Sequence, residues 1–295
     1  GKPKLAVHTQ RGIAMHARKV ARFTGMGPGD ATLCALPLAG VFGFVQAIAS
    51  LAGSAACIFL PVFDAQAAAF AIEQHRVTHF YGSDTMFAPV LAVADVSLAT
   101  WRHGGIADFS GRTQAVVEEA EQRWGVRIAG LYGMSECFAL ISFFDPADPP
   151  AQRCLAGGRP IDASIRFRIA DPDSGALLPN GEHGELQLHG YNVMRGYLAN
   201  PHASKAAFTE DGWFRTGDLA VSDGVAFRFL SRLRDSLRLH GYLVDPFEIE
   251  SALCEHPSVS AAQVVGTRVE GVGDVAVAFV VQRESADEAS LLEFC

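Results

Sequence analysis

The run GWFRTGDLA at 212–220 places an acid directly after a glycine and behind an aromatic anchor. In such a turn Asp218 could accept hydrogen bonds from both hydroxyls of a ribose. The alternative is a plain β-turn that Trp213 anchors. Taken alone, the run leaves both interpretations open.

A second run, YGMSE at 132–136, follows an expected strand at 126–131. The Tyr132 ring could stack on a purine, the Ser135 hydroxyl could reach phosphate oxygens, and the Glu136 carboxylate could hold Mg2+. Taken alone, the run favours an ordinary strand-to-loop turn.

The same run also resembles the G-x-S-x-G nucleophile elbow of α/β-hydrolases. Cys137 stands where the elbow has its last glycine, and the stretch 138–144 looks like a strand rather than the helix that an elbow needs. We therefore exclude a hydrolase elbow.

A charged run, 232–238, precedes Gly241 and a helix start at Pro246. Charge runs usually form a solvated face. This one lies at a change in composition, where a hinge between domains needs few contacts. We therefore expect a hinge here.

At the other end of the chain, Lys4 could meet phosphate, although any exposed chain end supplies lysines.

The elements that would position these runs alternate between amphipathic helices and short apolar strands up to about residue 150. This alternation predicts a mostly parallel sheet covered by helices, with ligands at the carboxyl ends of its strands. The expected helices are 10–23, 43–51, 64–75, 84–94 and 110–124, and the expected strands are 32–36, 55–60, 78–81 and 126–131.

After residue 145 the pattern changes to turns rich in proline, glycine and aspartate between period-two segments, which predicts a small antiparallel barrel or sheet. A third part begins at Asp235, with a helix and two strands. The segments are 164–169, 184–189 and 225–230, followed by the helix 247–255, the strands 261–265 and 275–281 and a final helical run at 287–294.

Composition narrows the class of protein. The 295 residues carry a net charge of −8 and no basic cluster, which argues against nucleic acid or an anionic membrane as the main partner. Six scattered cysteines without metal-binding spacing and the lack of a signal peptide favour a reduced, cytoplasmic protein. The apolar stretch 41–63 is broken by polar residues and Pro61, so we expect no transmembrane segment.

In their order along the chain, these runs resemble the motifs of the acyl-CoA synthetases, adenylation domains and luciferases, a superfamily that forms acyl-adenylates from ATP. Lys4 resembles the lysine that ends the phosphate loop of that family, and YGMSE resembles its Tyr-Gly-x-Ser/Thr-Glu motif. The run 212–220 is similar to its Gly-Trp-x-x-Thr-Gly-Asp motif, and 232–250 to its hinge and the motif after it. The resemblance covers nearly the whole chain.

This resemblance implies roles for individual residues. Tyr132 would stack on adenine, Ser135 would touch the phosphates and Glu136 would bind Mg2+. Asp218 and Arg232 would hold the ribose. The expected catalytic residues are Glu136, Arg232 and Lys4, and the expected nucleotide and CoA contacts are Gly105, Ile106, Ala107, Tyr132, Gly133, Ser135, Asp218, Arg232 and Gly241.

The resemblance also implies an α/β fold. A large AMP-binding domain at 1–230 would combine a mostly parallel sheet and helices with a small antiparallel β-barrel, and would lack its N-terminal portion. A hinge at 231–235, turning about Arg234, would lead to a truncated α+β domain at 236–295. Gly241 would lie in the loop that lines the pantetheine channel, and Gly105, Ile106 and Ala107 would form a strand end beside adenine and the acyl group.

Two departures from the family pattern stand out. The phosphate loop is present only from its last glycine onward, and the distal lysine that assists adenylation would lie beyond Cys295. A fragment is the better explanation, and we expect the fragment itself to be inactive. In addition, Ala39 and Gly40 stand where acyl-CoA synthetases often carry an aromatic-histidine pair, which should leave room for a wider acyl group.

The implied reaction has ATP, Mg2+ and CoA as cofactors and a fatty or aryl carboxylic acid as substrate. The acid would first become an acyl-adenylate and then a CoA thioester. One alternative is an adenylation module that loads a carrier protein. Another is an inactive nucleotide-binding protein. The sequence does not name the acid.

Overall fold

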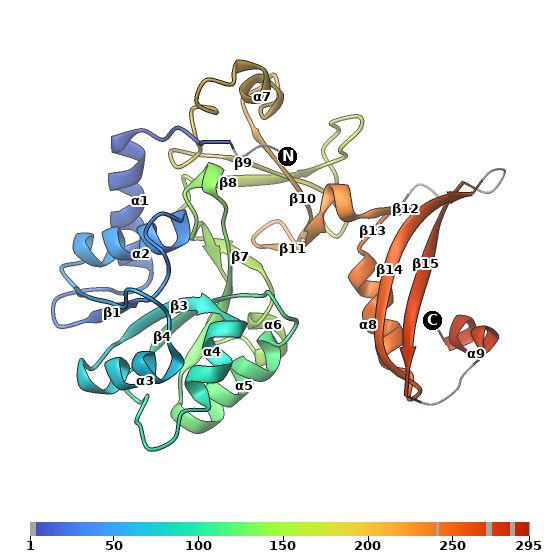
Figure 1. Cartoon of the computed structure of the whole chain (residues 1–295). Helices are drawn as coiled ribbons and strands as arrows, with labels where there is room; N and C mark the ends of the chain where they lie inside the picture. The colour runs from blue at the N-terminus through green and yellow to red at the C-terminus, as the bar shows by residue number, and fades with distance from the viewer. Residues whose placement is uncertain (1–3, 240–241, 270–272, 284–286, 295) are drawn as a thin grey trace. The chain divides into compact units, whose positions relative to one another are not determined.

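The computed structural model describes residues 4–239, 242–269, 273–283 and 287–294 (Figure 1). The chain divides into two compact units, and each is described by itself. The first comprises Gly1–Arg168, Gln187–Arg215 and Asp223–Phe229, and the second comprises Ile169–Leu186, Thr216–Ser222 and Leu230–Cys295.

The first unit contains the parallel sheet that the alternating pattern predicts. Its strands pair in the order β2-β1-β3-β4-β5, and every neighbouring pair is parallel. Their carboxyl ends therefore meet at one edge of the sheet, where a ligand site is expected. The strands are β1 (Ala31–Cys34), β2 (Ala56–Phe59), β3 (His79–Ser83), β4 (His103–Ala107) and β5 (Arg127–Tyr132).

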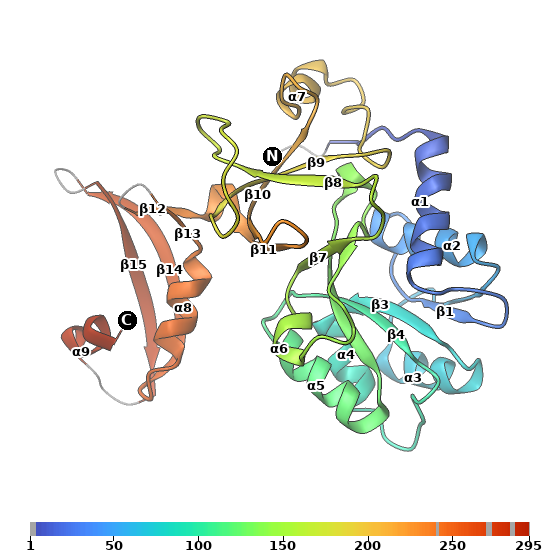
Figure 2. The same ribbon diagram turned by 180° about the vertical axis from the view of Figure 1, so that it is seen from behind.

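Helices connect these strands and cover the sheet. In Figures 1 and 2, α3, α4 and α5 lie along one face and α1 and α2 along the other. Thr9 caps α1 by accepting a hydrogen bond from the amide of Gly12 at 2.9 Å. The helices are α1 (Gln10–Phe23), α2 (Val41–Ala52), α3 (Ala65–Gln74), α4 (Asp84–Leu91) and α5 (Thr113–Trp124).

The main core lies between the strands and α3 to α5. Apolar side chains from the buried strands meet the inner faces of these helices, and large rings fill the middle. Phe87 lies 4.9 Å, centroid to centroid, from both Phe80 and Trp101. All three side chains are fully buried, so this packing fixes the strands on which the candidate site is built.

Further strands continue the hydrogen-bonded order from β5 as β6-β7-β11-β10-β9-β8. The β5–β6, β6–β7 and β7–β11 pairs are antiparallel. The elements here are β6 (Ser142–Phe143), α6 (Pro150–Arg153), β7 (Gly157–Pro160), β8 (Arg166–Ala170), β9 (Gly184–His189), α7 (Pro201–Ala206), β10 (Phe214–Ser222) and β11 (Phe227–Arg232).

The C-terminal part of the second unit is a helix packed on antiparallel hairpins. Asp245 caps α8 by accepting from the amide of Phe247 at 3.1 Å, and Pro246 occupies the first helical position. Leu253 of the helix packs with Val259 and Val264 of β14. The elements are β12 (Leu237–Leu239), β13 (Tyr242–Val244), α8 (Pro246–Cys254), β14 (Val259–Val269), β15 (Gly273–Gln282) and α9 (Glu288–Phe294).

The structure corrects one expectation and adds strands that the residue pattern did not predict, namely β4, β7, β10, β12 and β13. The stretch 138–144 was expected to be a strand, but only Ser142–Phe143 forms one, because residues 138–140 take positive φ angles and turn the chain. β4 was not among the strands expected from the alternating pattern, although the family resemblance implied a strand end at Gly105, Ile106 and Ala107. Its two glycines lower the strand propensity, and burial between β3 and β5 compensates.

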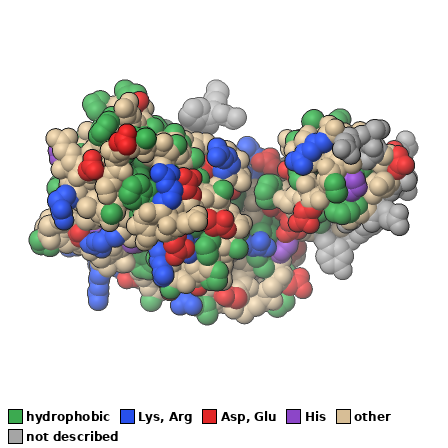
Figure 3. Space-filling model, turned by 90° about the horizontal axis from the view of Figure 1, so that it is seen from below, with side chains coloured by type: hydrophobic (Ala, Val, Ile, Leu, Met, Phe, Trp, Pro, Cys, Tyr) green, Lys and Arg blue, Asp and Glu red, His purple; other side chains and the backbone are tan. Residues whose placement is uncertain are grey.

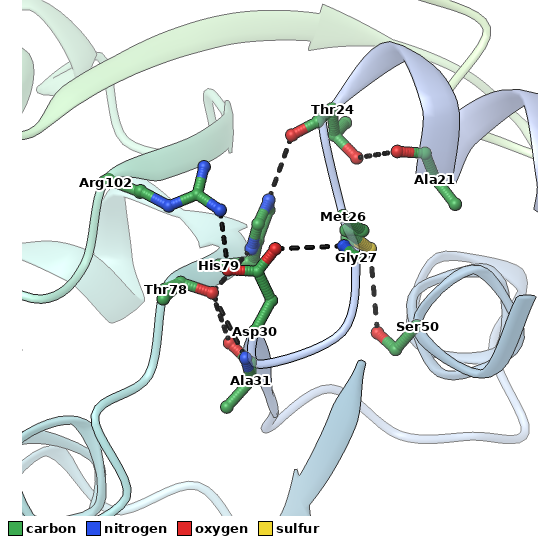
Figure 4. Close-up of polar contacts among 10 residues, drawn as sticks. All are labelled: Ala21, Thr24, Met26, Gly27, Asp30, Ala31, Ser50, Thr78, His79 and Arg102. Atoms are coloured by element: carbon green, nitrogen blue, oxygen red, sulfur yellow. Dashed lines mark hydrogen bonds and ion pairs between the residues drawn. The ribbon is translucent and has the colours of Figure 1, made fainter. Parts of the chain in front are cut away.

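A polar cluster stands at the amino ends of β3 and β4 (Figure 4). His79 is fully buried, and its ring nitrogens contact the carbonyl oxygen of Thr24 at 3.0 Å and the hydroxyl of Thr78 at 2.8 Å. Asp30 pairs with Arg102 at 2.6 Å. The ring of His103 stacks on that of His79 with centroids 5.5 Å apart. These contacts satisfy the polar side chains at this edge of the sheet, so their role is structural.

Acidification is expected to destabilise the first unit through its buried histidines. Burial lowers the pKa of His103 to about 3, with the charges of His79 and Arg102 adding to it, and burial also lowers the pKa of His79. Because both lie below the unfolded value of 6.5, this stability is fully present above about pH 6.5 and is lost as the pH falls through the acid range.

The melting temperature should therefore fall by several degrees between pH 7 and pH 5, where the neutral His103 forfeits up to about 2 kcal/mol. His103→Phe keeps an aromatic ring next to Tyr81 and removes one ionisable group. Its melting temperature should fall less over the same interval, and a fall equal to that of the wild type would contradict this account.

No helix among the described residues is long and apolar enough to cross a membrane. On the face seen in Figure 3, basic and acidic side chains are interspersed.

Candidate functional site

The run YGMSE begins at the carboxyl end of β5, where the parallel sheet predicts a ligand. Tyr132 is buried, and its ring lies edge-on to Phe227 at 5.3 Å and tilted against Phe229 at 5.9 Å. Gly133 and Ser135 are exposed, and Glu136 is half-buried. A rigid aromatic anchor is thus followed at once by accessible polar groups.

Glu136 is oriented by a residue that the sequence did not single out. The hydroxyl of Tyr197 donates to Oε1 of Glu136 at 2.8 Å. Burial raises the pKa of Tyr197, and the hydrogen bond and charge of Glu136 raise it further, so the phenol remains a donor. One carboxylate oxygen is held in this way.

Lys4 joins this pair. Residues 5–7 run alongside 195–198, with Ala6 bridged to Tyr197 and the amide of Leu198 donating to the carbonyl of Leu5 at 2.8 Å. This pairing places Nζ of Lys4 4.1 Å from the centroid of the Tyr197 ring, a cation–π contact. Lys4, Tyr197 and Glu136 therefore form a cluster, which we call the Lys4–Tyr197–Glu136 cluster.

The single carboxylate of Glu136 suits Mg2+ better than it suits a metal ion whose ligands all come from the protein. Mg2+ usually takes one or two carboxylates and completes its shell with water and substrate phosphates. Over the part of the chain that the structure describes, no group of three or more His, Cys, Asp or Glu side chains gathers to hold a metal. A metal at Glu136 would therefore draw its other ligands from phosphate and water.

Gly133 is required by the turn that follows the run. A Cβ at this position would lie 2.5 Å from Cα of Ala139 and 2.6 Å from the amide nitrogen of Leu140. Phe138, Ala139 and Leu140 have φ angles of 64°, 53° and 43°, so the backbone of three successive non-glycine residues is in the left-handed region. Each costs about 1–2 kcal/mol, and the turn persists because its side chains are buried.

Gly133→Ala is expected to destabilise the protein and displace this turn. The new methyl group meets backbone atoms, which cannot rotate away, so we expect a cost of about 1–3 kcal/mol and a melting temperature lower by several degrees. The matched control is Gly27→Ala, since a Cβ there has no atom within 4 Å. Equal melting temperatures for the two variants would contradict the close approach at Gly133.

The strand end at Gly105, Ile106 and Ala107 lies at the same edge of the sheet. Gly105 and Ile106 are buried in β4, and Ala107 is its half-buried last residue. β4 pairs in parallel with β5, with Ile106 opposite Gly130. The structure thus brings the end of β4 beside the strand that carries Tyr132.

Asp84 holds the loop that leaves β4. Its carboxylate is fully buried and accepts from the amides of Phe109 at 3.1 Å, Ser110 at 3.0 Å and Arg112 at 3.2 Å. Burial raises the pKa of Asp84, but the donors of Ser110, Arg112 and Phe109 outweigh it and the net shift is downward. A charged carboxylate therefore ties this loop to α4.

The second unit contains the other pair of predicted site residues. Asp218 lies in β10 with 1% of its surface exposed, and Nη1 of Arg232 is 2.6 Å from its Oδ1. The Asp218 amide donates to Oγ1 of Thr216 at 3.1 Å, and that hydroxyl donates to the carbonyl of Leu186 at 2.6 Å. The side chain of Arg232 is 45% exposed. Gly217 precedes Asp218 in the same strand and has a φ of 69°, so the tight turn expected here is a strand with one left-handed glycine.

The predicted hinge is a short turn. After Arg232, the residues Leu233–Asp235 form a single 3-10 turn. Arg234 and Asp235 pair with each other at 3.3 Å on the surface, with 83% and 59% of their side chains exposed. Gly241 lies outside the described residues. Of the predicted site residues, Lys4, Tyr132 and Glu136 belong to the first unit and Asp218 and Arg232 to the second.

Comparison with known proteins gives a consistent result. Residues 1–198 match the family model of the AMP-binding enzymes, and residues 248–295 match that of the AMP-binding enzyme C-terminal domain. The chain is 33% identical over 303 residues to the sulfoacetate–CoA ligase of Cupriavidus necator, covering 100% of the chain and 58% of that protein. It is 31% identical over 300 residues to the 2-succinylbenzoate–CoA ligase of Bacillus licheniformis, covering 100% and 60%.

Solved structures agree with these matches. The O-succinylbenzoate coenzyme A synthetase of Bacillus subtilis in complex with AMP superposes with a TM-score of 0.83 at 27% identity, over 100% of this chain and 60% of that one. The ATP-bound MatB of Rhodopseudomonas palustris gives 0.83 at 25% identity, over 100% and 58%. The chain thus spans just over half the length of each of these relatives. Its α/β fold, its motifs and its family match agree: the chain belongs to the AMP-binding enzymes.

Proposed function

We propose that the protein to which this chain belongs uses ATP to activate a carboxylic acid and then transfers the acyl group to CoA. The observation that carries the proposal is the Lys4–Tyr197–Glu136 cluster at the carboxyl end of β5, in a chain of the AMP-binding family. The relatives support the same reaction class, since they are CoA ligases.

In the first half-reaction, an oxygen of the substrate carboxylate attacks the α-phosphorus of ATP, and the bond from that phosphorus to pyrophosphate breaks. Glu136 would hold Mg2+, which would neutralise charge on the phosphates when bound. Lys4 would lie near the same phosphates as a second cation. Catalysis would come mainly from positioning these groups.

In the second half-reaction, the thiolate of CoA attacks the acyl carbon, a carbon–sulfur bond forms and AMP leaves. The side chains of Asp218 and Arg232 would hold the ribose through both steps, and Tyr132 and the strand end 105–107 would line the adenine side. We further propose that the chain comprises a large domain at 1–230, a hinge at 231–235 and a small domain at 236–295. The short exposed turn at Leu233–Asp235 supports a hinge there.

The acid is proposed only as a class. Ala39 and Gly40 lack the bulk of an aromatic-histidine pair, while Leu38 and Phe44 are 48% and 39% exposed. Small residues beside apolar ones suit a fatty or aryl acid. A cytoplasmic location is also part of the proposal, and the reduced thiols of Cys34, Cys57, Cys154 and Cys254 are compatible with it.

Carboxylate-dependent exchange of pyrophosphate into ATP tests the first half-reaction. The complete protein should catalyse this exchange with Mg2+ and at least one acid from a panel of fatty and aryl acids, and the 295-residue chain alone should not. No exchange with any acid, despite ATP binding, would favour an inactive nucleotide-binding protein. Incubating the adenylate with CoA or with a carrier protein, and measuring the thioester, then separates the two acceptors.

A further inference from the structure

His16 of α1 is a buried histidine with both ring nitrogens occupied. Its exposed surface is 0%, and its Nε2 lies 2.8 Å from the carbonyl oxygen of Ala139 while its Nδ1 lies 2.9 Å from the hydroxyl of Tyr191. A carbonyl can only accept, so Nε2 carries the proton and Nδ1 accepts from the tyrosine. Burial lowers the pKa of His16 to about 4, so the ring is neutral at physiological pH.

The acceptor of this bond is the middle residue of the left-handed turn 138–140. That turn packs on Gly133, since a Cβ there would lie 2.5 Å from Cα of Ala139. The ring of Phe138 stands edge-on to that of His16, with centroids 6.0 Å apart. His16 therefore contacts the turn that packs against Gly133 of the YGMSE run.

The backbone between Ser135 and Ala139 is held from outside by other elements too. The His8 ring donates to the carbonyl of Ser135 at 2.7 Å. The backbone amide of Met194 donates to the carbonyl of Glu136 at 2.8 Å. The side-chain amide of Asn192 donates to the carbonyl of Cys137 at 2.8 Å. With His16 on Ala139, four carbonyls around Glu136 have a donor from a distant part of the chain. This pattern fixes a backbone that its own left-handed residues disfavour.

α1 is built for this contact. A Cβ at Gly12 would lie 2.8 Å from the carbonyl oxygen of Tyr191, so only glycine allows the helix to come this close. His16 is one turn further along the same face. Lys19 continues the face, with its Nζ 4.4 Å from the centroid of the Tyr191 ring and an ion pair to Asp162.

We propose that His16 is a positioning residue for the nucleotide site: by donating to Ala139 it holds the turn 138–140 against Gly133 and so fixes Ser135 and Glu136. It touches no substrate in this role. The effect on catalysis rests on the proposed function, whereas the effect on the turn does not.

The experiment compares His16→Leu and His16→Gln with His79→Leu in the complete protein. His79 is the matched control, because it is equally buried and also bonds a backbone carbonyl, that of Thr24, but at the amino ends of the strands (Figure 4). Gln can place an amide donor near the position of the lost Nε2. Melting temperature, hydrogen–deuterium exchange over 133–141 and the kcat and KM of pyrophosphate exchange are measured for each variant.

His16→Leu should speed amide exchange over 133–141 by about 10-fold or more and lower kcat by about 10- to 100-fold with little change in KM for ATP. His16→Gln should restore most of the slow amide exchange and most of kcat. His79→Leu should lower the melting temperature but change neither the amide exchange over 133–141 nor kcat. Unchanged amide exchange in His16→Leu, or an equal loss of kcat in His79→Leu, would overturn the proposal. If the wild type shows no pyrophosphate exchange, the proposed function fails, and amide exchange still decides whether His16 holds the turn.

Discussion

Glu136→Gln in the complete protein is expected to lower the kcat of pyrophosphate exchange by about 100- to 1000-fold, the range seen when one preorganised electrostatic group is removed. The amide oxygen can still accept from Tyr197, whose hydroxyl lies 2.8 Å from Oε1 in the wild type. The substitution therefore keeps the packing and removes the negative charge. What is lost is the carboxylate that would hold Mg2+ against the phosphates.

The Mg2+ dependence makes this prediction specific. The Mg2+ concentration for half-maximal exchange should rise at least 10-fold in Glu136→Gln, because a neutral amide is a poorer ligand for a hard cation. Fluorescence titration of a labelled ATP with and without Mg2+ gives a second readout that does not depend on turnover. Binding in the absence of Mg2+ should change little.

Glu119→Gln is the control, since this carboxylate pairs with Arg123 on the exposed surface of α5. It should retain exchange activity, because exposed pairs contribute little. If Glu136→Gln exchanged pyrophosphate as fast as Glu119→Gln, with the same Mg2+ dependence, Glu136 would have no role in the reaction.

Much of the fold could be predicted because local patterns decide it. The helix at Gln10–Phe23 and the strand at Gly184–His189 occupy their predicted bounds, since a capping Thr9 and a strict alternation mark their ends. The 138–144 stretch was predicted wrongly. Its apolar residues are buried, but 138–140 form a left-handed turn instead of a strand. The turn packs closely against Gly133, a residue outside the stretch.

The contacts that assemble the candidate site could not be predicted from local sequence patterns. Tyr197 bonds a carboxylate 61 positions earlier, and His16 bonds a carbonyl 123 positions away. Nothing next to either residue in the sequence indicates a role, because each is brought to the site by a sheet pairing or a helix packing. Asp218 and Arg232 are 14 positions apart, and their motifs marked both in advance.

The second large effect is expected at the ribose side. Asp218→Asn should weaken AMP binding by about 10- to 100-fold, since hydrogen bonds to a charged acceptor contribute about 1.5–3 kcal/mol. Asp218 is 1% exposed and so sits in a setting where its charge is poorly screened. Asn keeps the size of the side chain, and the half-exposed guanidinium of Arg232 can turn to water. The melting temperature should therefore change by only a few degrees.

AMP analogues that lack one ribose hydroxyl test directly whether Asp218 accepts hydrogen bonds from the ribose. If Asp218 accepts from the ribose, 3′-deoxy-AMP and 2′-deoxy-AMP should bind the wild type more weakly than AMP, and this discrimination should shrink by about 10-fold in Asp218→Asn. Asp235→Asn, in an exposed pair with Arg234, is the control and should discriminate as the wild type does. Discrimination that is unchanged in Asp218→Asn would place the ribose elsewhere, because an acceptor that no longer carries charge cannot bond the hydroxyls with the same strength.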